Sequence, residues 1–101
     1  MNSVLGDNLD KIKSYCQKYG VKNLYAFGSA VSNDFTDESD VDLLVSFKDL
    51  KPEDYADNYF ELHDVFEKLF DRKVDMLTDR SLHNPFFIKS VDSQKQLLFE
   101  E

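Results

Sequence analysis

The sequence predicts one domain of two layers, a β-sheet covered by helices, in an α/β or α+β arrangement. Short apolar runs of strand length alternate along the chain with segments of helical periodicity, and no segment repeats. Of the 101 residues, 42% are hydrophobic, and only 3 Gly and 2 Pro are present. This composition is typical of a packed core without a long flexible linker, so we expect residues 1–101 to form a single domain.

The first predicted element is a helix over about residues 5–19. Its apolar residues recur at spacings of three and four: Leu5, Leu9, Ile12, Cys16 and Tyr19. Gly20 suits the position just past a helix end, and the first strand is expected from Val21 to Phe27. Because Cys16 lies in the apolar stripe, we expect it to pack in the core rather than to act as a reactive thiol.

Five further elements complete the chain: a strand over about 40–47, a helix over about 53–70, a strand over 73–77, a short helix from Asn84 onward and a final strand over 96–99. The helix over 53–70 carries a strong apolar stripe, which we expect to cover the sheet. The stripe consists of Tyr55, Tyr59, Leu62, Phe66, Leu69 and Phe70.

The charge of the chain restricts its partners. Acidic residues outnumber basic ones by 20 to 12, giving a net charge of −8 without any basic cluster. Direct nucleic-acid binding by this chain alone is therefore disfavoured, since Lys and Arg supply most of that affinity. A nucleotide held through metal ions is compatible with the charge, and so is a basic protein partner.

The compartment is expected to be the cytoplasm. No apolar run approaches the roughly 18–20 residues of a membrane span, and no basic-then-apolar signal segment begins the chain. The single Cys16 cannot form an intrachain disulfide, which fits a reducing environment.

Three carboxylates stand out because they lie in strand-like apolar runs. Asp40 and Asp42 are two residues apart, so on a strand they share one face with Cα atoms about 6.6 Å apart. Asp75 lies between apolar neighbours in a later strand. An Asp-x-Asp pair alone is a weak motif in an acidic chain, but three carboxylates on neighbouring strands repel unless they are protonated or bound to cations. Metal binding is the simpler resolution at neutral pH.

Oxygen ligands without a His or Cys cluster favour Mg²⁺, with Mn²⁺ as an alternative, over zinc. His63 and His83 have no second His at ligand spacing, so we expect structural or surface roles for them. Mg²⁺ is usually held by one or two carboxylates and by substrate phosphates, which indicates phosphoryl or nucleotidyl transfer. No Gly-Lys-Ser/Thr follows Gly28, so the chain has no Walker A loop there.

The residues singled out above resemble the signature of the polymerase-β-type nucleotidyltransferases: Phe27-Gly28-Ser29, Ser39-Asp40-Val41-Asp42-Leu43 and Val74-Asp75-Met76. That signature is a Gly-Ser turn, a Ser-Asp-x-Asp strand and a third Asp on a later strand. The length and the ending around Asn84-Pro85 are similar to those of the minimal nucleotidyltransferases. The resemblance covers about residues 20–100 and implies an α+β, palm-like fold with a mixed sheet packed with helices.

The resemblance also implies roles. Asp40 and Asp42 would bind two Mg²⁺ ions with ATP, and Asp75 would complete the metal site and help to deprotonate the incoming hydroxyl. Gly28 and Ser29 would hold the β- and γ-phosphates. AMP would pass from ATP to a Tyr or other hydroxyl of a partner, a HEPN-domain toxin, in a hetero-oligomer. The chain would then be the antitoxin of a toxin–antitoxin pair.

One segment departs from the family pattern. Many relatives follow Gly-Ser with a basic Arg-Ala-Arg-Gly-like segment, whereas this chain has Ala30-Val31-Ser32-Asn33. The missing charges are expected to weaken triphosphate binding or to leave that work to the partner. Two alternatives stay open: a non-catalytic module that neutralises its partner by complex formation, and nucleotidyl transfer to a small molecule such as an aminoglycoside. An intact set of three aspartates favours the enzyme.

Overall fold

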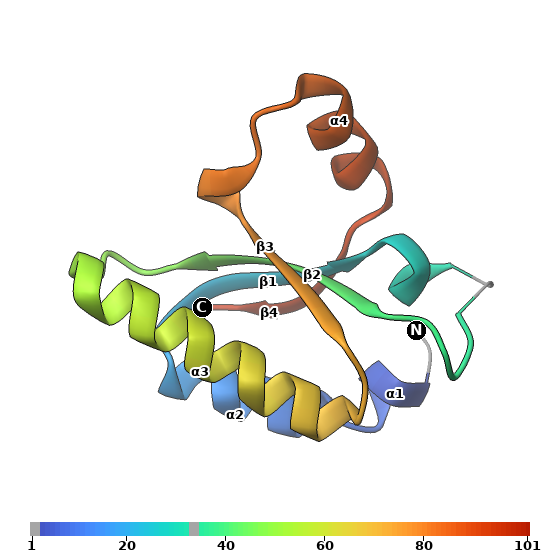
Figure 1. Cartoon of the computed structure of the whole chain (residues 1–101), viewed down its shortest axis with the longest axis horizontal. Coiled ribbons are helices and arrows are strands. Elements are labelled where there is room, and N and C mark those ends of the chain that lie inside the picture. The colour runs from blue at the N-terminus through green and yellow to red at the C-terminus, as the bar shows by residue number, and fades with distance from the viewer. Residues whose placement is uncertain (1–2, 33–34) are drawn as a thin grey trace.

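The computed structural model describes residues 3–32 and 35–101 (Figure 1). Its elements are α1 (Ser3–Gly6), α2 (Leu9–Lys18), β1 (Val21–Phe27), η1 (Gly28–Val31), β2 (Val41–Phe47), α3 (Pro52–Phe70), β3 (Val74–Thr78), η2 (Asp79–Ser81), α4 (Pro85–Gln94) and β4 (Gln96–Glu100). The predicted order of long helices and strands is confirmed. None of the helices in the described ranges is long and apolar enough to cross a membrane.

The four strands form one mixed sheet in the order β3-β2-β1-β4. β1 is antiparallel to both β2 and β4, whereas β2 is parallel to β3. A parallel pair needs a long crossover connection, and α3 supplies it. α2 and α3 lie against one face of the sheet, and α4 lies on the opposite side (Figure 1). The α+β fold with a mixed sheet is therefore confirmed.

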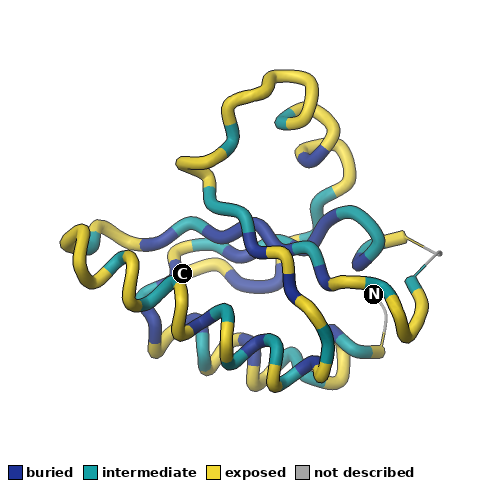
Figure 2. The backbone as a smooth tube through the Cα atoms, viewed as in Figure 1, coloured by how far each residue is buried: buried dark blue, intermediate teal, exposed yellow. Residues whose placement is uncertain are grey.

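The main core fills the space between the sheet and the helices α2 and α3. The tube in Figure 2 has buried stretches along β1 and β2, and it alternates between buried and exposed along α2 and α3. The predicted stripe of α3 faces this core, with Leu62 and Phe66 fully buried. A smaller cluster of Phe27, Leu44 and Val91 lies on the other face, under α4. Each strand therefore divides its side chains between two different surroundings.

The single helix predicted over residues 5–19 is wrong, because the structure has two helices with a turn at Asp7 and Asn8. The Nδ2 group of Asn8 donates to the carbonyl oxygen of Val4 at 2.7 Å. Such local bonds from Asn side chains offer the backbone an alternative to helix continuation. Leu5 is nevertheless fully buried with the rest of the apolar stripe. Burial also raises the pKa of the Cys16 thiol to about 12, in keeping with the predicted packing role.

Candidate active site beside the Gly28 turn

Two of the predicted aspartates lie side by side on neighbouring strands. The parallel register of β2 and β3 pairs Asp42 directly with Asp75. Each is flanked by buried core residues, so its side chain lies on the opposite face of the sheet. Asp42 is half-buried and Asp75 is exposed. The structure thus brings together two residues that are 33 positions apart in the sequence.

The Gly28 turn lies directly against this pair. β1 ends at Phe27, which pairs with Asp42 across the antiparallel ladder. Gly28 then has a φ of 61°, a left-handed conformation that favours glycine. A Cβ atom placed on Gly28 would lie only 2.4 Å from the Oδ2 atom of Asp42. Glycine is therefore required here both by the backbone conformation and by the closeness of the carboxylate.

Ser29 links the turn to both halves of the Asp-x-Asp motif. Its backbone N–H donates a hydrogen bond to the Asp42 carboxylate. Its Oγ donates to the carbonyl oxygen of Asp40 at 3.2 Å. Hydrogen bonds therefore join the Gly-Ser turn to the Asp-x-Asp motif, although Asp40 lies 11 positions after Ser29 in the sequence.

Asp40 is exposed and lies immediately before β2, which begins at Val41. It still acts on Asp42 through its charge. The pKa of Asp42 is raised above its ordinary value first by burial, then by the negative charges of Asp75 and Asp40. The hydrogen bond from Ser29 opposes this rise. All three aspartates therefore contribute to one negatively charged site.

The donor set at this site consists of carboxylate oxygens. Hard divalent cations such as Mg²⁺ and Mn²⁺ prefer such ligands. A bound cation would also offset the repulsion that raises the pKa of Asp42. Asp40, Asp42 and Asp75 are thus the residues of this site that could hold a metal.

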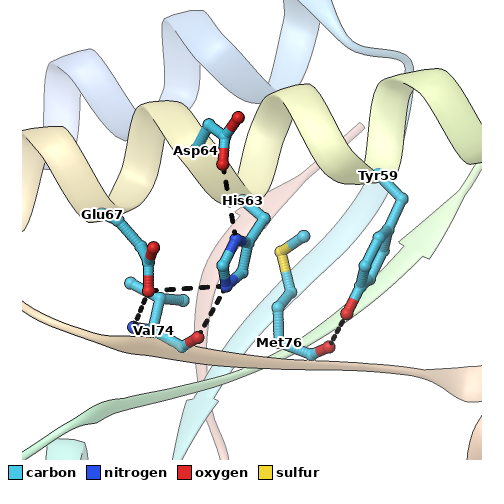
Figure 3. A network of polar contacts seen from close by, with 6 residues as sticks. All are labelled: Tyr59, His63, Asp64, Glu67, Val74 and Met76. Carbon is cyan, nitrogen blue, oxygen red and sulfur yellow. Dashed lines mark hydrogen bonds and ion pairs between the residues drawn. The ribbon is translucent and has the colours of Figure 1, made fainter.

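The edge strand β3, which carries Asp75, is attached to α3 by a row of polar side chains (Figure 3). Tyr59 Oη donates to the carbonyl oxygen of Met76, and His63 Nε2 bonds to the carbonyl oxygen of Val74 at 2.8 Å. Glu67 accepts a hydrogen bond from the backbone N–H of Val74 at 2.9 Å. Four helical residues and two strand residues both span about 6–7 Å, so the two spacings match.

These contacts hold the backbone on both sides of Asp75 and protect the open edge of the sheet. A second group of side chains of metal-binding type also lies on α3, and the same contacts give this group a structural role. The ligand atoms of His63, Asp64 and Glu67 lie within 4.8 Å of one another. Two of these three side chains, however, are already bonded to the backbone of Val74. The predicted structural role of His63 is confirmed.

Arg72 is a supporting residue that the sequence analysis missed. Its guanidinium donates to the carbonyl oxygens of Thr36 at 2.9 Å and Ser39 at 3.0 Å. It also lies over the ring of Phe35, 4.6 Å from the ring centroid. Since Ser39 immediately precedes Asp40, the hydrogen bonds of Arg72 hold the backbone that leads into the site. No local signal identifies Arg72, because its bonding partners are more than 30 residues away in the sequence.

The segment that departs from the family pattern begins in η1. Ala30 is buried and Val31 is half-buried there, so both apolar side chains contribute to packing. Asn33 lies outside the described residues.

The chain is similar to known proteins in both sequence and fold. Residues 10–101 match the family model described as polymerase beta, nucleotidyltransferase. A Methanocaldococcus jannaschii protein with the name "putative protein adenylyltransferase" is 39% identical over 75 residues, which are 74% of each chain. A solved "putative minimal nucleotidyltransferase" has a TM-score of 0.76 at 25% identity, over 91% of this chain and 90% of that chain.

A third comparison is with a solved complex of tri-AMPylated Shewanella oneidensis HEPN toxin and MNT antitoxin. One of its chains has a TM-score of 0.65 at 23% identity, over 95% of this chain and 72% of that chain, and so shares the fold. The family model spans most of the chain and includes the turn and all three aspartates. This chain belongs to the polymerase-β-type nucleotidyltransferase family.

Proposed function

We propose that this protein transfers AMP from ATP to a hydroxyl of a partner protein, a HEPN-type toxin, and thereby acts as an antitoxin in the cytoplasm. The observation that carries the proposal is the in-register pair of Asp42 and Asp75 beside the Gly28 turn. The name of the archaeal relative supports the reaction. The AMPylated HEPN toxin in the Shewanella complex supports the kind of partner.

Asp40, Asp42 and Asp75 are the proposed ligands of two Mg²⁺ ions. When bound, such a pair neutralises charge on the transferred phosphate and on the attacking and leaving oxygens. The exposed carboxylate of Asp75 accepts the proton of the incoming hydroxyl. A bond forms between the acceptor oxygen and the α-phosphorus, the bond to the β-phosphate oxygen breaks, and pyrophosphate leaves.

Gly28 and Ser29 receive the β- and γ-phosphates in this proposal. Gly28 has no side chain, so a phosphate can approach the backbone of the turn closely. The Ser29 hydroxyl is bonded to a carbonyl oxygen at 3.2 Å and can exchange that bond for one to a phosphate oxygen. Because Ala30 and Val31 carry no charge, triphosphate affinity depends on the metals, the turn and the partner.

The mass of the partner tests the proposal. The purified protein is incubated with ATP, Mg²⁺ and the proposed HEPN-type partner, and both intact chains are weighed. We expect the partner to gain one or more AMP units, and to gain none with Asp75→Asn, because that variant loses both a metal ligand and the proton acceptor. A stable complex without any gain in mass would instead support the non-catalytic binding module.

A further inference from the structure

We infer that a groove between α3 and β3 docks a short, positively charged segment of the acceptor protein, with an apolar side chain seated in the groove; this inference rests on the proposed function. The groove has a volume of about 450 Å³, enough to take a large side chain. Uncharged side chains line it, among them Tyr55, Tyr59 and Phe60 from α3 and Met76, Leu77 and Thr78 from β3.

The aromatic wall of the groove is ordered but open to solvent. Phe60 lines the groove and is still 66% exposed. Its ring packs edge-on against Tyr59, with the ring centroids 5.3 Å apart. Tyr59 is held in turn by its hydrogen bond to the carbonyl oxygen of Met76 (Figure 3). A partner can therefore bury this wall without a large cost in side-chain entropy, and aromatic residues of this kind are enriched in protein interfaces.

The surface around the groove is strongly acidic. Residues 53–64 of α3 include five acidic residues and neither Lys nor Arg, and all five are exposed: Glu53, Asp54, Asp57, Glu61 and Asp64. Asp57 lies three residues before Phe60 and Asp64 lies four after it, so both are neighbours of its side chain on the helix surface. Complementary charge orients a partner and raises its rate of association. The segment that fills the groove must therefore carry basic residues beside its apolar anchor.

The same charges disfavour the competing occupants. A second copy of this chain would bring a net charge of −8 to an acidic surface. A nucleic-acid strand would likewise meet charge of its own sign. The basic side chain beside the groove, Arg80, lies over the ring of Tyr55 at 4.4 Å from its centroid and is outnumbered by the acids of α3. A positively charged protein segment is the occupant that fits both the apolar lining and the acidic surroundings.

The position of the groove fits a docking site for the acceptor. In an in-line displacement, the leaving pyrophosphate and the incoming hydroxyl lie on opposite sides of the α-phosphorus. The proposed phosphate site at Gly28 follows β1, and Asp75 lies on β3, with Asp42 between them. The acceptor therefore approaches over β3, which is an edge strand. Leu77 lines the groove and lies one step of about 6.6 Å from Asp75 along the same strand face. A segment docked in the groove thus brings its neighbouring residues to Asp75.

The affinity of the HEPN-type partner, measured by calorimetry without ATP, tests the apolar anchor. We expect the partner to bind about 5–30-fold more weakly to Phe60→Ala than to the unmodified protein, in line with the loss of one anchoring side chain. In AMP transfer, the same variant should raise the KM for the partner and leave the KM for ATP unchanged. Leu97→Ala removes an exposed apolar side chain from β4, the opposite edge strand, and should change none of these values.

Asp57→Lys tests the charge of the bound segment. This variant should bind the partner more weakly at low salt, and its affinity should depend less on the NaCl concentration, because salt screens exposed charges. Asp10→Lys makes the same change on the exposed surface of α2 and controls for net charge, so its effect should be much the smaller. Tighter binding by Asp57→Lys would mean an acidic segment and would overturn the assignment.

The remaining outcomes separate the groove from the reaction. Unchanged partner affinity in Phe60→Ala, with AMP transfer intact in the unmodified protein, would overturn the groove alone. Failure of the unmodified protein to modify a partner that it binds would overturn the proposed function, and the role of the groove in acceptor binding with it. Self-association of the unmodified protein that Phe60→Ala abolishes would assign the groove to a second copy of this chain, and would also overturn the inference.

Discussion

Asp42→Asn is expected to lower the rate of AMP transfer by about 10³-fold or more while the protein remains folded. The substitution keeps the size of the side chain but removes the charge that faces Asp75 and the Gly28 turn. Loss of a metal ligand forfeits several kcal/mol of transition-state stabilisation, and about 1.4 kcal/mol corresponds to each tenfold in rate. Single-turnover transfer of AMP to the partner measures the effect. Asp10→Asn, the same charge change on the exposed surface of α2, should leave the rate unchanged.

The same variant is expected to be more stable than the unmodified protein at pH 7 in EDTA. Burial and the charges of Asp75 and Asp40 raise the folded-state pKa of Asp42 above its unfolded value of about 3.9. The neutral form is therefore favoured by folding. The preference for a neutral Asp42 carboxyl stabilises the folded protein fully at pH values below the unfolded pKa. This stabilisation is lost as the pH rises through the folded pKa.

Melting temperatures across a pH series check this signature. The advantage of Asp42→Asn should be present at pH 7 and should vanish near pH 3, where both proteins carry a neutral side chain. Added Mg²⁺ should raise the melting temperature of the unmodified protein more than that of the variant, because ligand binding stabilises the folded state. A variant that melts below the unmodified protein at pH 7 in EDTA would contradict the described electrostatics.

Gly28→Ala is expected to destabilise the protein and to lower AMP transfer by about 10²-fold or more. The left-handed backbone at Gly28 alone costs a residue with a side chain about 1–2 kcal/mol. The new Cβ would in addition lie 2.4 Å from Asp42 Oδ2, so the carboxylate must move. A displacement of about 1 Å at a reacting site is sufficient for such a loss of rate. Chemical denaturation and single-turnover transfer measure the two effects separately.

Gly20→Ala separates the effect of backbone strain from that of the clash. Gly20 also has a positive φ, of 73°, but a Cβ there would meet the Leu50 side chain at an ordinary contact distance of 3.4 Å. We expect a similar cost from the backbone conformation and an unchanged rate of transfer. Equal loss of transfer in Gly20→Ala and Gly28→Ala would mean that the rate reports only global stability, and not the position of Asp42.

The part of the site that the sequence predicts depends on periodicity. Alternation along a strand places Asp42 opposite the core residues Val41 and Leu43, and the structure shows this alternation. The pairing of Asp42 with Asp75 depends instead on the register of two distant strands. Spacing within one strand holds no information on that register, so the alternation predicts the face on which each Asp lies but not which residue it meets on the next strand.

The parts that the sequence analysis missed are interactions of side chains with distant backbone groups. Tyr59 and Glu67 bond to the outer edge of β3, and which strand forms an edge follows from the strand order rather than from local pattern. Arg72 bonds to carbonyl oxygens in the loop before Asp40. The break at Asn8 likewise depends on one side-chain hydrogen bond, and the helical periodicity of the apolar residues gives no sign of it.

The reaction class is the central claim, and the fate of labelled phosphate tests it most directly. The protein, Mg²⁺ and its partner are supplied in parallel with ATP labelled at the α-phosphate or at the γ-phosphate. Transfer of AMP predicts that the α-label becomes bound to the partner, that the γ-label is released as pyrophosphate, and that Asp42→Asn abolishes both. Labelling of the partner from the γ-phosphate, or α-labelling that persists in Asp42→Asn, would contradict nucleotidyl transfer at this site.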